Sequence, residues 1–386
     1  LLISSISIKD LELPERLIVN SLMITDRFVW QNSNPTDFYQ YLGVRSTKTT
    51  ASTQSSSKRA IKHLFNATTG NNLFVQSLKE LLSFLEFEET FEVQYSTKIN
   101  KLFFSGELQK KDFRKYFEEW WDDKFEYSKR KKENPLWSIP YYNNNFYGND
   151  KKIEQIITYL NEISKQEGKL KNKKNSSAKI ITIDLLGEKI DEKDIEIIGQ
   201  LESLDIVNLE GIKIKKKESK LSITEVSSGE YHMLISLIGL FANISQNSLL
   251  LIDEPEISLH PNWQMRYVTF LKNIFLKFST CHFILTTHSH FLVSDLEGKS
   301  SSVTSLNRDI ETNQLIAKLL DLNTYGWSAE DVLYNVFNVV STRNKFVAED
   351  IANILNELSV GDKNKVNKIS KEKYDEIVRL EEALKE

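Results

Sequence analysis

The sequence predicts an α/β protein in which a mixed sheet is flanked by helices, with a helical insert and a helical C-terminal region attached. Three observations support this. Apolar runs typical of strands occur near the N-terminus and again between residues 179 and 298, where they alternate with helical patterns. Residues 76–178 place apolar and aromatic side chains at helical spacing between charges. Beyond residue 300 the pattern is helical again.

Four zones follow along the 386-residue chain. Residues 1–75 contribute the first part of the sheet and include a Ser/Thr-rich stretch whose low hydrophobicity is typical of a loop. Residues 76–178 form the mainly helical insert, which ends in a polar, basic connector. Residues 179–300 supply the remaining strands of the sheet and its covering helices. Residues 301–386 form a helical C-terminal region.

The composition narrows the class of protein. With 40% hydrophobic and 27% charged residues, the chain matches an ordinary soluble domain, and no stretch approaches the roughly 20 apolar residues of a membrane span. We therefore expect no membrane partner. The single cysteine, Cys281, excludes a disulfide framework and fits a reducing compartment such as the cytoplasm. The net charge of −4 argues against a surface that is basic throughout. Nucleic-acid binding is still possible, but only through a local basic patch or through a partner.

The stretch "SLLLIDEP" (248–255) places two adjacent carboxylates after an apolar run. An apolar run without polar alternation predicts a strand buried on both faces, as in a parallel sheet, so Asp253 and Glu254 lie at its carboxyl end. Ligands of open α/β sheets bind at that edge. A second buried strand, "HFILTTH" (282–288), ends in His288. We therefore expect the two acids and His288 on one rim of one sheet.

The stretch "VSSGE" (226–230) begins a helix with an apolar stripe. Ser227 and Glu230 form an S-x-x-E capping box, and one interpretation is simply a well-capped core helix. The other is that Ser227, Ser228 and Gly229 present hydroxyl and backbone N–H groups at the positive end of the helix, which suits a phosphate. Neither interpretation excludes the other.

Four motifs in this order resemble those of ABC-type ATPases of the SMC and RecF kind. "VSSGE" resembles the signature motif, "LLLIDEPE" (249–256) the Walker B strand, "SLHP" (258–261) the D-loop and "ILTTHS" (284–289) the switch-histidine segment. All four lie within about 65 residues, which makes the set far more specific than any single motif. The resemblance implies an ABC-type head, a P-loop NTPase-like fold that binds ATP and Mg²⁺.

The resemblance also implies a role for each residue. Asp253 would hold Mg²⁺, and Glu254 would orient and deprotonate the attacking water. His288 would contact the γ-phosphate. Ser227 and Gly229, within the segment 227–230, would contact ATP bound by a second subunit, so the site would be completed by a homodimer or a higher oligomer.

One element of such a site does not occur in these residues. The phosphate-binding loop, G-x-x-x-x-G-K-[ST], has no match. Gly298 begins a "GKS" triplet, but position 293 is Val where the first glycine is needed, and the triplet follows the switch histidine. Because the chain begins with Leu1, we expect the Walker A loop upstream. The alternative is a chain that does not bind ATP by itself.

Three further segments resemble the PtuA-like ATPases of anti-phage Septu and retron systems, namely residues 13–28, 39–45 and 322–344. That family implies a partner HNH nuclease, and in retrons a reverse transcriptase with its multicopy DNA. The roughly 86 residues after residue 300 are predicted to be helical, and we expect no nuclease centre in them. Two alternatives stay open: a non-hydrolysing ABC-fold scaffold that binds nuclease or nucleic acid, and a RecF-like DNA-repair ATPase.

Basic and aromatic clusters allow two interpretations. Lysines and arginine at 129–132 lie near Trp137, and Lys215, Lys216 and Lys217 follow a predicted strand. Such groups bind phosphate backbones in some proteins. Acidic residues nearby favour a solvated surface here. The adjacent tryptophans Trp120 and Trp121 are better explained as part of a core or of a subunit contact than as a surface on which nucleic-acid bases stack.

Overall fold

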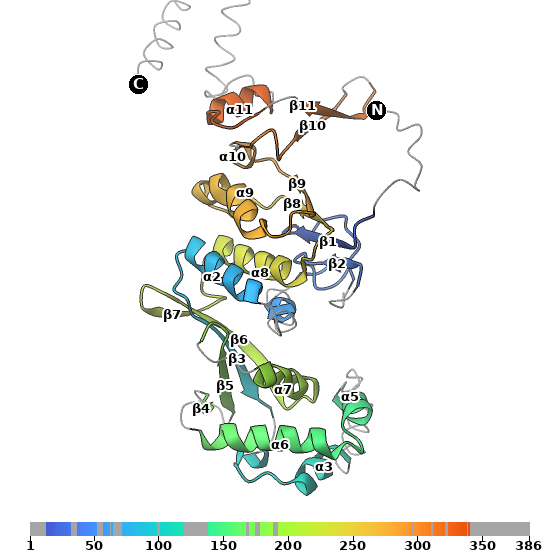
Figure 1. Cartoon of the computed structure of the whole chain (residues 1–386), viewed down its shortest axis with the longest axis vertical. Helices are drawn as coiled ribbons and strands as arrows, with labels where there is room; N and C mark the ends of the chain where they lie inside the picture. Colours follow the sequence, from blue (N-terminus) through green and yellow to red (C-terminus); the bar gives the residue numbers. More distant parts are fainter. Residues whose placement is uncertain are drawn as a thin grey trace, which may run out of the picture. The chain divides into compact units, whose positions relative to one another are not determined.

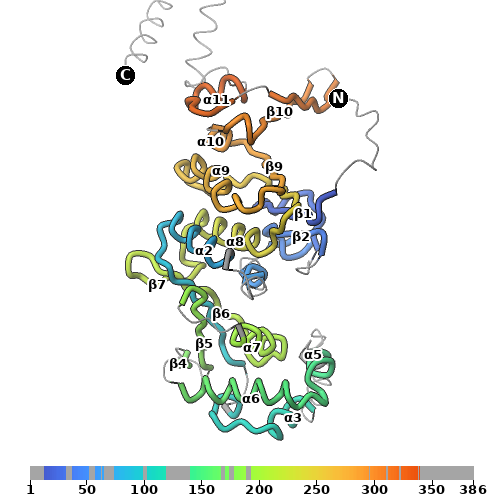
Figure 2. Tube along the Cα trace, in the orientation of Figure 1, coloured from blue at the N-terminus to red at the C-terminus, as the bar shows by residue number. Residues whose placement is uncertain are grey.

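The structure is a computed structural model, shown in Figures 1 and 2. It describes residues 13–31, 37–51, 57–61, 63–64, 72–98, 101–118, 138–166, 170–173, 178–187, 192–294, 296–309, 312–320, 323–337 and 339. The chain divides into two compact units. The first comprises Leu1–Trp263 and Val268–Thr287, and the second comprises Gln264–Tyr267 and His288–Glu386.

The first unit contains a four-stranded parallel sheet. Its order is β2-β1-β8-β9, and the strands are β1 (Arg16–Ser21), β2 (Tyr39–Tyr41), β8 (Ser248–Asp253) and β9 (His282–Thr286). The strands predicted near the N-terminus and at residues 248–253 and 282–288 therefore form and belong to one sheet. The strand predicted directly after residue 178 also forms, but it belongs to a second, antiparallel sheet, so the prediction of a single sheet is wrong for it. Because every pairing in the four-stranded sheet is parallel, all four carboxyl ends lie at the same edge of that sheet.

The burial of these strands differs from the prediction. In β8, Leu250 and Ile252 are buried while Leu249 and Leu251 are half-buried, so only one face is fully covered. In β9 the pattern is more exposed still, and Ile284 keeps 45% of its surface accessible. The expectation that both strands are buried on two faces is wrong for the structure as described. Among the described strands, β9 pairs with β8 alone and so lies at an edge of the sheet, which is consistent with its exposure.

Helices cover the parallel sheet. α8 (Ser228–Asn243) contacts β1, where Asn20 donates a 2.6 Å hydrogen bond to the Ser236 hydroxyl. α2 (Asn72–Phe84) lies beside α8 (Figure 1). α9 (Pro261–Phe275) follows the β8 loop, and Phe275 contacts Phe241 of α8 with ring centroids 5.4 Å apart. Aromatic packing of this kind adds to the burial of apolar area.

Two segments that resemble PtuA-like proteins meet beside this sheet. Within 13–28 and 39–45, Arg45 forms a buried ion pair with Asp26, with 2.6 Å between Nη2 and Oδ1. The Tyr41 hydroxyl donates to the other carboxylate oxygen of Asp26 at 2.7 Å. Buried charges persist only when paired in this way. The network therefore fixes the loops that follow β1 and β2.

A second sheet is antiparallel and has the order β4-β5-β3-β6-β7. Its strands are β3 (Phe91–Thr97), β4 (Leu170–Asn172), β5 (Lys179–Asp184), β6 (Val207–Lys216) and β7 (Ser219–Ser222). β3 lies inside the region predicted to be mainly helical. Phe91, Val93 and Tyr95 alternate with polar residues and are fully buried, the period of a strand with one face in the core. α7 (Glu192–Ser203) contacts β6.

The other described elements of the insert are helices, apart from the short strand β4, which lies in the predicted connector. The helices are η2 (Lys101–Phe104), α3 (Lys110–Glu118), α5 (Ser138–Asn145) and α6 (Asp150–Lys165). α3 and α5 share an aromatic cluster in which the Phe117 and Tyr142 rings stack with centroids 4.8 Å apart. Residues 120–121, 129–132 and Trp137 lie outside the described residues, so their predicted surface or core roles stay predictions.

The second unit contains α10 (His290–Val293), β10 (Val303–Arg308), β11 (Leu315–Leu320) and α11 (Ala329–Asn335). The helical prediction is wrong for residues 303–320, because β10 and β11 form an antiparallel hairpin. Val303 and Leu320 pair across the strands and pack against the small core that contains Val332. The last predicted helix, from about residue 370, lies outside the described residues. Among the described helices, none has the length and apolar content needed to traverse a bilayer.

Candidate functional site at the carboxyl edge of the parallel sheet

Asp253 ends β8 at the predicted rim. The strand register places it between Ser21, the last residue of β1, and Thr286, the last residue of β9. Thr286 Oγ1 donates to Asp253 Oδ1 at 2.5 Å, and Ser21 Oγ donates to Oδ2 at 3.2 Å. Both carboxylate oxygens are thus oriented by hydroxyl groups from neighbouring strands. Ser21 and Thr286 were not predicted as site residues, although each lies within a run predicted to form a strand.

Glu254 adopts a backbone conformation that is rare for its residue type. Its φ is +46°, in the left-handed region, and its N–H donates to the Thr286 carbonyl at 3.0 Å. Ser258, in the same loop, has a φ of +67°. Such conformations cost energy in a residue with a side chain and concentrate at functional sites. The chain therefore turns sharply at Glu254, and the two neighbouring acids do not continue along one strand.

The α8 tip, residues 227–230, has the predicted capping box. The Ser227 backbone N–H and hydroxyl donate to Glu230 Oε2 at 2.8 and 2.7 Å, and the Glu230 N–H donates back to Ser227 Oγ at 3.3 Å. Ser227 and Ser228 are exposed, whereas Gly229 and Glu230 are buried. The predicted capping box is confirmed, and the tip also presents exposed seryl residues at the positive end of the helix.

Gly229 brings this tip against the loop that follows Glu254. A Cβ atom at Gly229 would lie 2.4 Å from the Ser258 carbonyl oxygen and 3.3 Å from the Trp263 ring. A backbone oxygen at that distance leaves no room for a side chain. The "VSSGE" and "SLHP" motifs are therefore packed against each other within one chain, and glycine is the residue that permits the contact.

Lys216 belongs to the basic cluster that the sequence favours as solvated surface, but in the structure it contacts the α8 tip. It ends β6, and its ammonium donates to Glu230 Oε1 at 2.6 Å while lying 5.0 Å from the centre of the Phe87 ring. Burial raises the pKa of Glu230, but hydrogen bonds from Lys216 and Ser227 outweigh it, and the pKa lies below its usual value. Neighbouring Lys215 pairs with Glu88 at the surface, as the acidic surroundings suggested.

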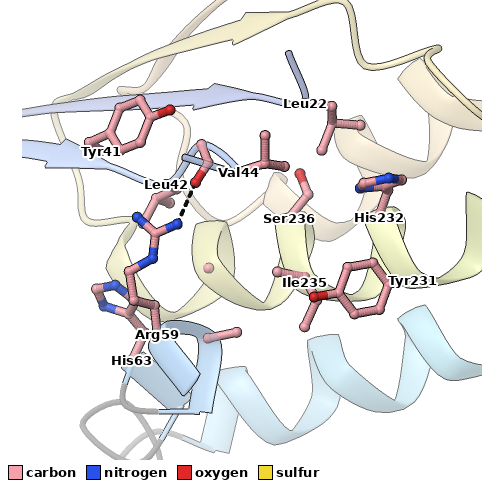
Figure 3. Close-up of a pocket in the computed structure, with 13 residues that line it drawn as sticks. Leu22, Tyr41, Leu42, Val44, Arg59, His63, Tyr231, His232, Ile235 and Ser236 are labelled. Carbon is pink, nitrogen blue, oxygen red and sulfur yellow. Dashed lines mark hydrogen bonds between the residues drawn. The ribbon is translucent and has the colours of Figure 1, made fainter. Parts of the chain in front are cut away.

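A pocket lies on the flank of α8 (Figure 3). Arg59 enters it from a short helical segment and donates to the Gly43 carbonyl at 2.7 Å, and Tyr231 and His232 line it from α8. Burial lowers the pKa of both Arg59 and His232. The rest of the lining is largely apolar, and none of the predicted site residues belongs to it.

Three histidines near the predicted motifs, His260, His288 and His290, lie in different surroundings. His288 is exposed and begins the second unit, so its meeting with Asp253 stays a prediction. His260 has a structural role: it is the N-cap of α9, and its Nδ1 accepts from the Asn262 N–H at 3.3 Å. His290 is the first residue of α10 and contacts Phe291.

Comparisons with known proteins agree with the motifs. Residues 19–293 match the model of a family described as an AAA ATPase domain. Septu protein PtuA of Bacillus thuringiensis is 28% identical over 120 residues, which are 31% of this chain and 29% of that protein. The chain therefore spans less than a third of the length of this curated relative.

A solved structure is also similar. It comes from a study titled "Structural biochemistry of ATP-driven dimerization and DNA stimulated activation of SMC ATPases" and is 15% identical, with a TM-score of 0.26 over 36% of this chain and 76% of that chain. The family match, by contrast, covers more than half of the chain and includes the α8 tip, Asp253 and Glu254. The chain belongs to the AAA ATPase domain family.

Proposed function

We propose that the chain is the ATPase subunit of a PtuA-like anti-phage defence system, in which ATP binding and hydrolysis by a dimer control a partner HNH nuclease. The observation that carries the ATPase part is the rim itself. A carboxylate oriented by two hydroxyl groups stands next to a glutamate in strained backbone geometry, at the edge where α/β sheets bind ligands. The similarity to Septu protein PtuA supports the defence assignment.

The residues at the rim fit Mg²⁺. This cation prefers oxygen ligands and is usually held by one or two carboxylates together with phosphate oxygens and water. Asp253 offers a carboxylate beside the hydroxyls of Ser21 and Thr286. Within the described residues there is no group of three His, Cys, Asp or Glu side chains that could cage a metal. A site of this kind depends on the nucleotide for its remaining ligands. Bound Mg²⁺ would neutralise charge on the transferring phosphoryl group.

Glu254 would act on water. Phosphoryl transfer needs an oriented nucleophile and little covalent chemistry from the protein. Glu254 follows β8 in a left-handed backbone conformation and is not part of the strand that Asp253 ends, so we assign the two carboxylates different partners. Glu254 would hold the attacking water in line and accept its proton, while His288, once beside the rim, would contact the γ-phosphate.

The α8 tip would complete the site of a second subunit. The N–H groups of Ser228 and Gly229 occupy the first turn of α8, where no intrahelical acceptor exists, and both seryl side chains at the tip are exposed. These groups suit a terminal phosphate. A nucleotide shared between one subunit's rim and the partner's tip would couple ATP binding to self-association.

ATP turnover by the complete protein tests the enzyme assignment. We expect Glu254→Gln to lower the rate by at least about a hundredfold, the usual effect of losing a general base, while ATP-dependent association persists. Glu80→Gln removes an exposed carboxylate on α2 and should leave turnover unchanged. Equal rates for Glu254→Gln and the unmodified protein would remove the enzyme assignment.

The second candidate is a non-hydrolysing scaffold with the same fold. It is favoured by one observation, that none of the 386 residues forms a G-x-x-x-x-G-K-[ST] loop. In that case neither the unmodified protein nor the Glu254→Gln variant hydrolyses ATP, yet both still bind the nuclease or the nucleic acid. Co-purification with the product of a neighbouring HNH gene would support the defence role, and the absence of such a gene would favour the RecF-like alternative.

A further inference from the structure

Glu230 creates an electrostatic problem at the α8 tip. Glu230 is buried, and its carboxylate accepts from the Ser227 N–H, the Ser227 hydroxyl and Lys216. An ionised carboxylate at the third position of a helix brings a full negative charge close to the N-terminus, where the helix itself carries roughly half a positive charge. Alone, Glu230 would therefore make the tip repel an anion.

Lys216 removes that charge. Its ammonium lies 2.6 Å from Glu230 Oε1, and the Phe87 ring, 5.0 Å away, gives the cation a second favourable contact. The Lys216 side chain is 27% exposed and the Glu230 side chain 10%, so dissolved salt screens this pair less than it screens a fully exposed pair. With both partners present the local charge is zero, and the positive end of α8 is what an approaching phosphate meets.

The hairpin of β6 and β7 supplies this lysine specifically. Lys216 pairs with Ser219 across the hairpin, and successive side chains on a strand point to opposite faces. Lys215 accordingly reaches a different partner, Glu88, at 2.7 Å. Two adjacent residues of the same type thus carry the same charge into different surroundings, and only one of them contacts the capping box.

We propose that Lys216 is a positioning residue of the nucleotide site, which keeps the α8 tip receptive to the terminal phosphate of a nucleotide held by a second subunit by neutralising Glu230. This rests on the proposed function. Lys216 touches neither nucleotide nor metal in this role. It acts through Glu230, and the second sheet thereby influences how the two subunits associate.

The test measures ATP-dependent self-association of the complete protein by sedimentation, with Glu254→Gln in every sample to prevent hydrolysis. Lys216→Met should weaken association by about tenfold or more, because it restores the negative charge at the tip. Lys216→Met combined with Glu230→Gln should return association to within about threefold of the parent, since glutamine keeps the capping box without the charge. Lys215→Met, the matched control, should match the parent.

These variants separate charge from structure. If Lys216 only stabilises the fold, association of the variants should follow their unfolding free energies measured by urea titration without ATP, because an unpaired buried carboxylate also destabilises the fold. The inference instead requires weaker association in a Lys216→Met protein that remains folded under the assay conditions. Unchanged association in Lys216→Met, or a double variant no better than Lys216→Met, would overturn the inference. Lys216→Arg keeps the charge and should associate within about threefold of the parent, which preserves the test if the methionine variant unfolds. A parent that does not associate with ATP would instead remove the proposed function itself.

Discussion

Two helices of this protein begin with the same local motif and differ in what surrounds it. α8 is capped by Ser227 and Glu230, and α11 is capped by Ser328 and Asp331 with equivalent hydrogen bonds. In α11 the hydroxyl of Ser328 donates to Asp331 at 2.8 Å, and both residues are exposed. In α8 the carboxylate is buried and bound by Lys216.

The difference lies in tertiary contacts rather than in capping. A capping box satisfies the orphan N–H groups of a first turn wherever it occurs. The second helical residue is Gly229 in α8, pressed against the Ser258 carbonyl, and Glu330 in α11, which is exposed. A capping box alone is therefore no sign of a binding site. Its contact with a strained loop and with a distant lysine is what distinguishes the α8 tip.

Replacing the second helical residue with alanine should produce the largest difference in stability between the α8 and α11 variants. Gly229→Ala places a Cβ atom 2.4 Å from the Ser258 carbonyl, and relieving that clash should cost about 3 kcal/mol of unfolding free energy, measured by urea titration. Glu330→Ala is the matched control and should change stability by less than about 0.5 kcal/mol. Similar costs in both variants would mean that the α8 tip and the loop are not tightly packed.

Local periodicity predicted much of the fold. The strands at the N-terminus and after residues 178, 247 and 281 form where the apolar runs occur, and α8 begins at its capping box. β3 was missed because its seven residues lie among amphipathic helices. The hairpin at 303–320 was missed because its strands are largely exposed and lack the clear alternation of a half-buried strand. How deeply a strand such as β9 is buried also depends on which strands lie beside it in the sheet, and the local sequence pattern does not contain that information.

The residues of the site that lie in short motifs were predictable from the sequence, whereas their partners were not. Asp253, Glu254 and the capping box follow from short motifs, and the structure places each on the element expected. Their partners come from elsewhere: Ser21 lies 232 residues from Asp253 along the chain, and Lys216 approaches Glu230 across a β-hairpin and a turn. Only sheet register and tertiary packing bring these groups together, so one sequence without structural information cannot identify them.

Replacing the N-cap serine should give an intermediate effect in both helices. Ser328→Ala should cost about 1 kcal/mol, the usual loss for an N-cap hydroxyl. Ser227→Ala should cost more, about 2 kcal/mol, because the buried Glu230 carboxylate also loses a donor. Hydrogen exchange of the first-turn amides measures both changes locally. Equal acceleration in α8 and α11 would contradict the distinction between the two boxes.

The pH dependence of stability should give the smallest and most specific difference. Because hydrogen bonds from Lys216 and Ser227 hold the pKa of Glu230 below its usual value despite burial, its contribution to stability is present above the unfolded pKa of about 4.3. That contribution is lost as the pH falls through the lower, folded-state pKa. The difference in unfolding free energy between the unmodified protein and Glu230→Gln should therefore narrow between about pH 6 and pH 3.

Asp331→Asn provides the control for this titration, since it removes an exposed carboxylate from the equivalent position of α11. Adding Lys216→Met to the series separates the two sources of the pKa shift. Without the ammonium, the capping hydrogen bonds remain while burial still opposes ionisation, so the narrowing should shrink or reverse. A pH profile unaffected by Lys216→Met would mean that Ser227 alone keeps Glu230 ionised, and the α8 tip would then differ from that of α11 in packing but not in charge.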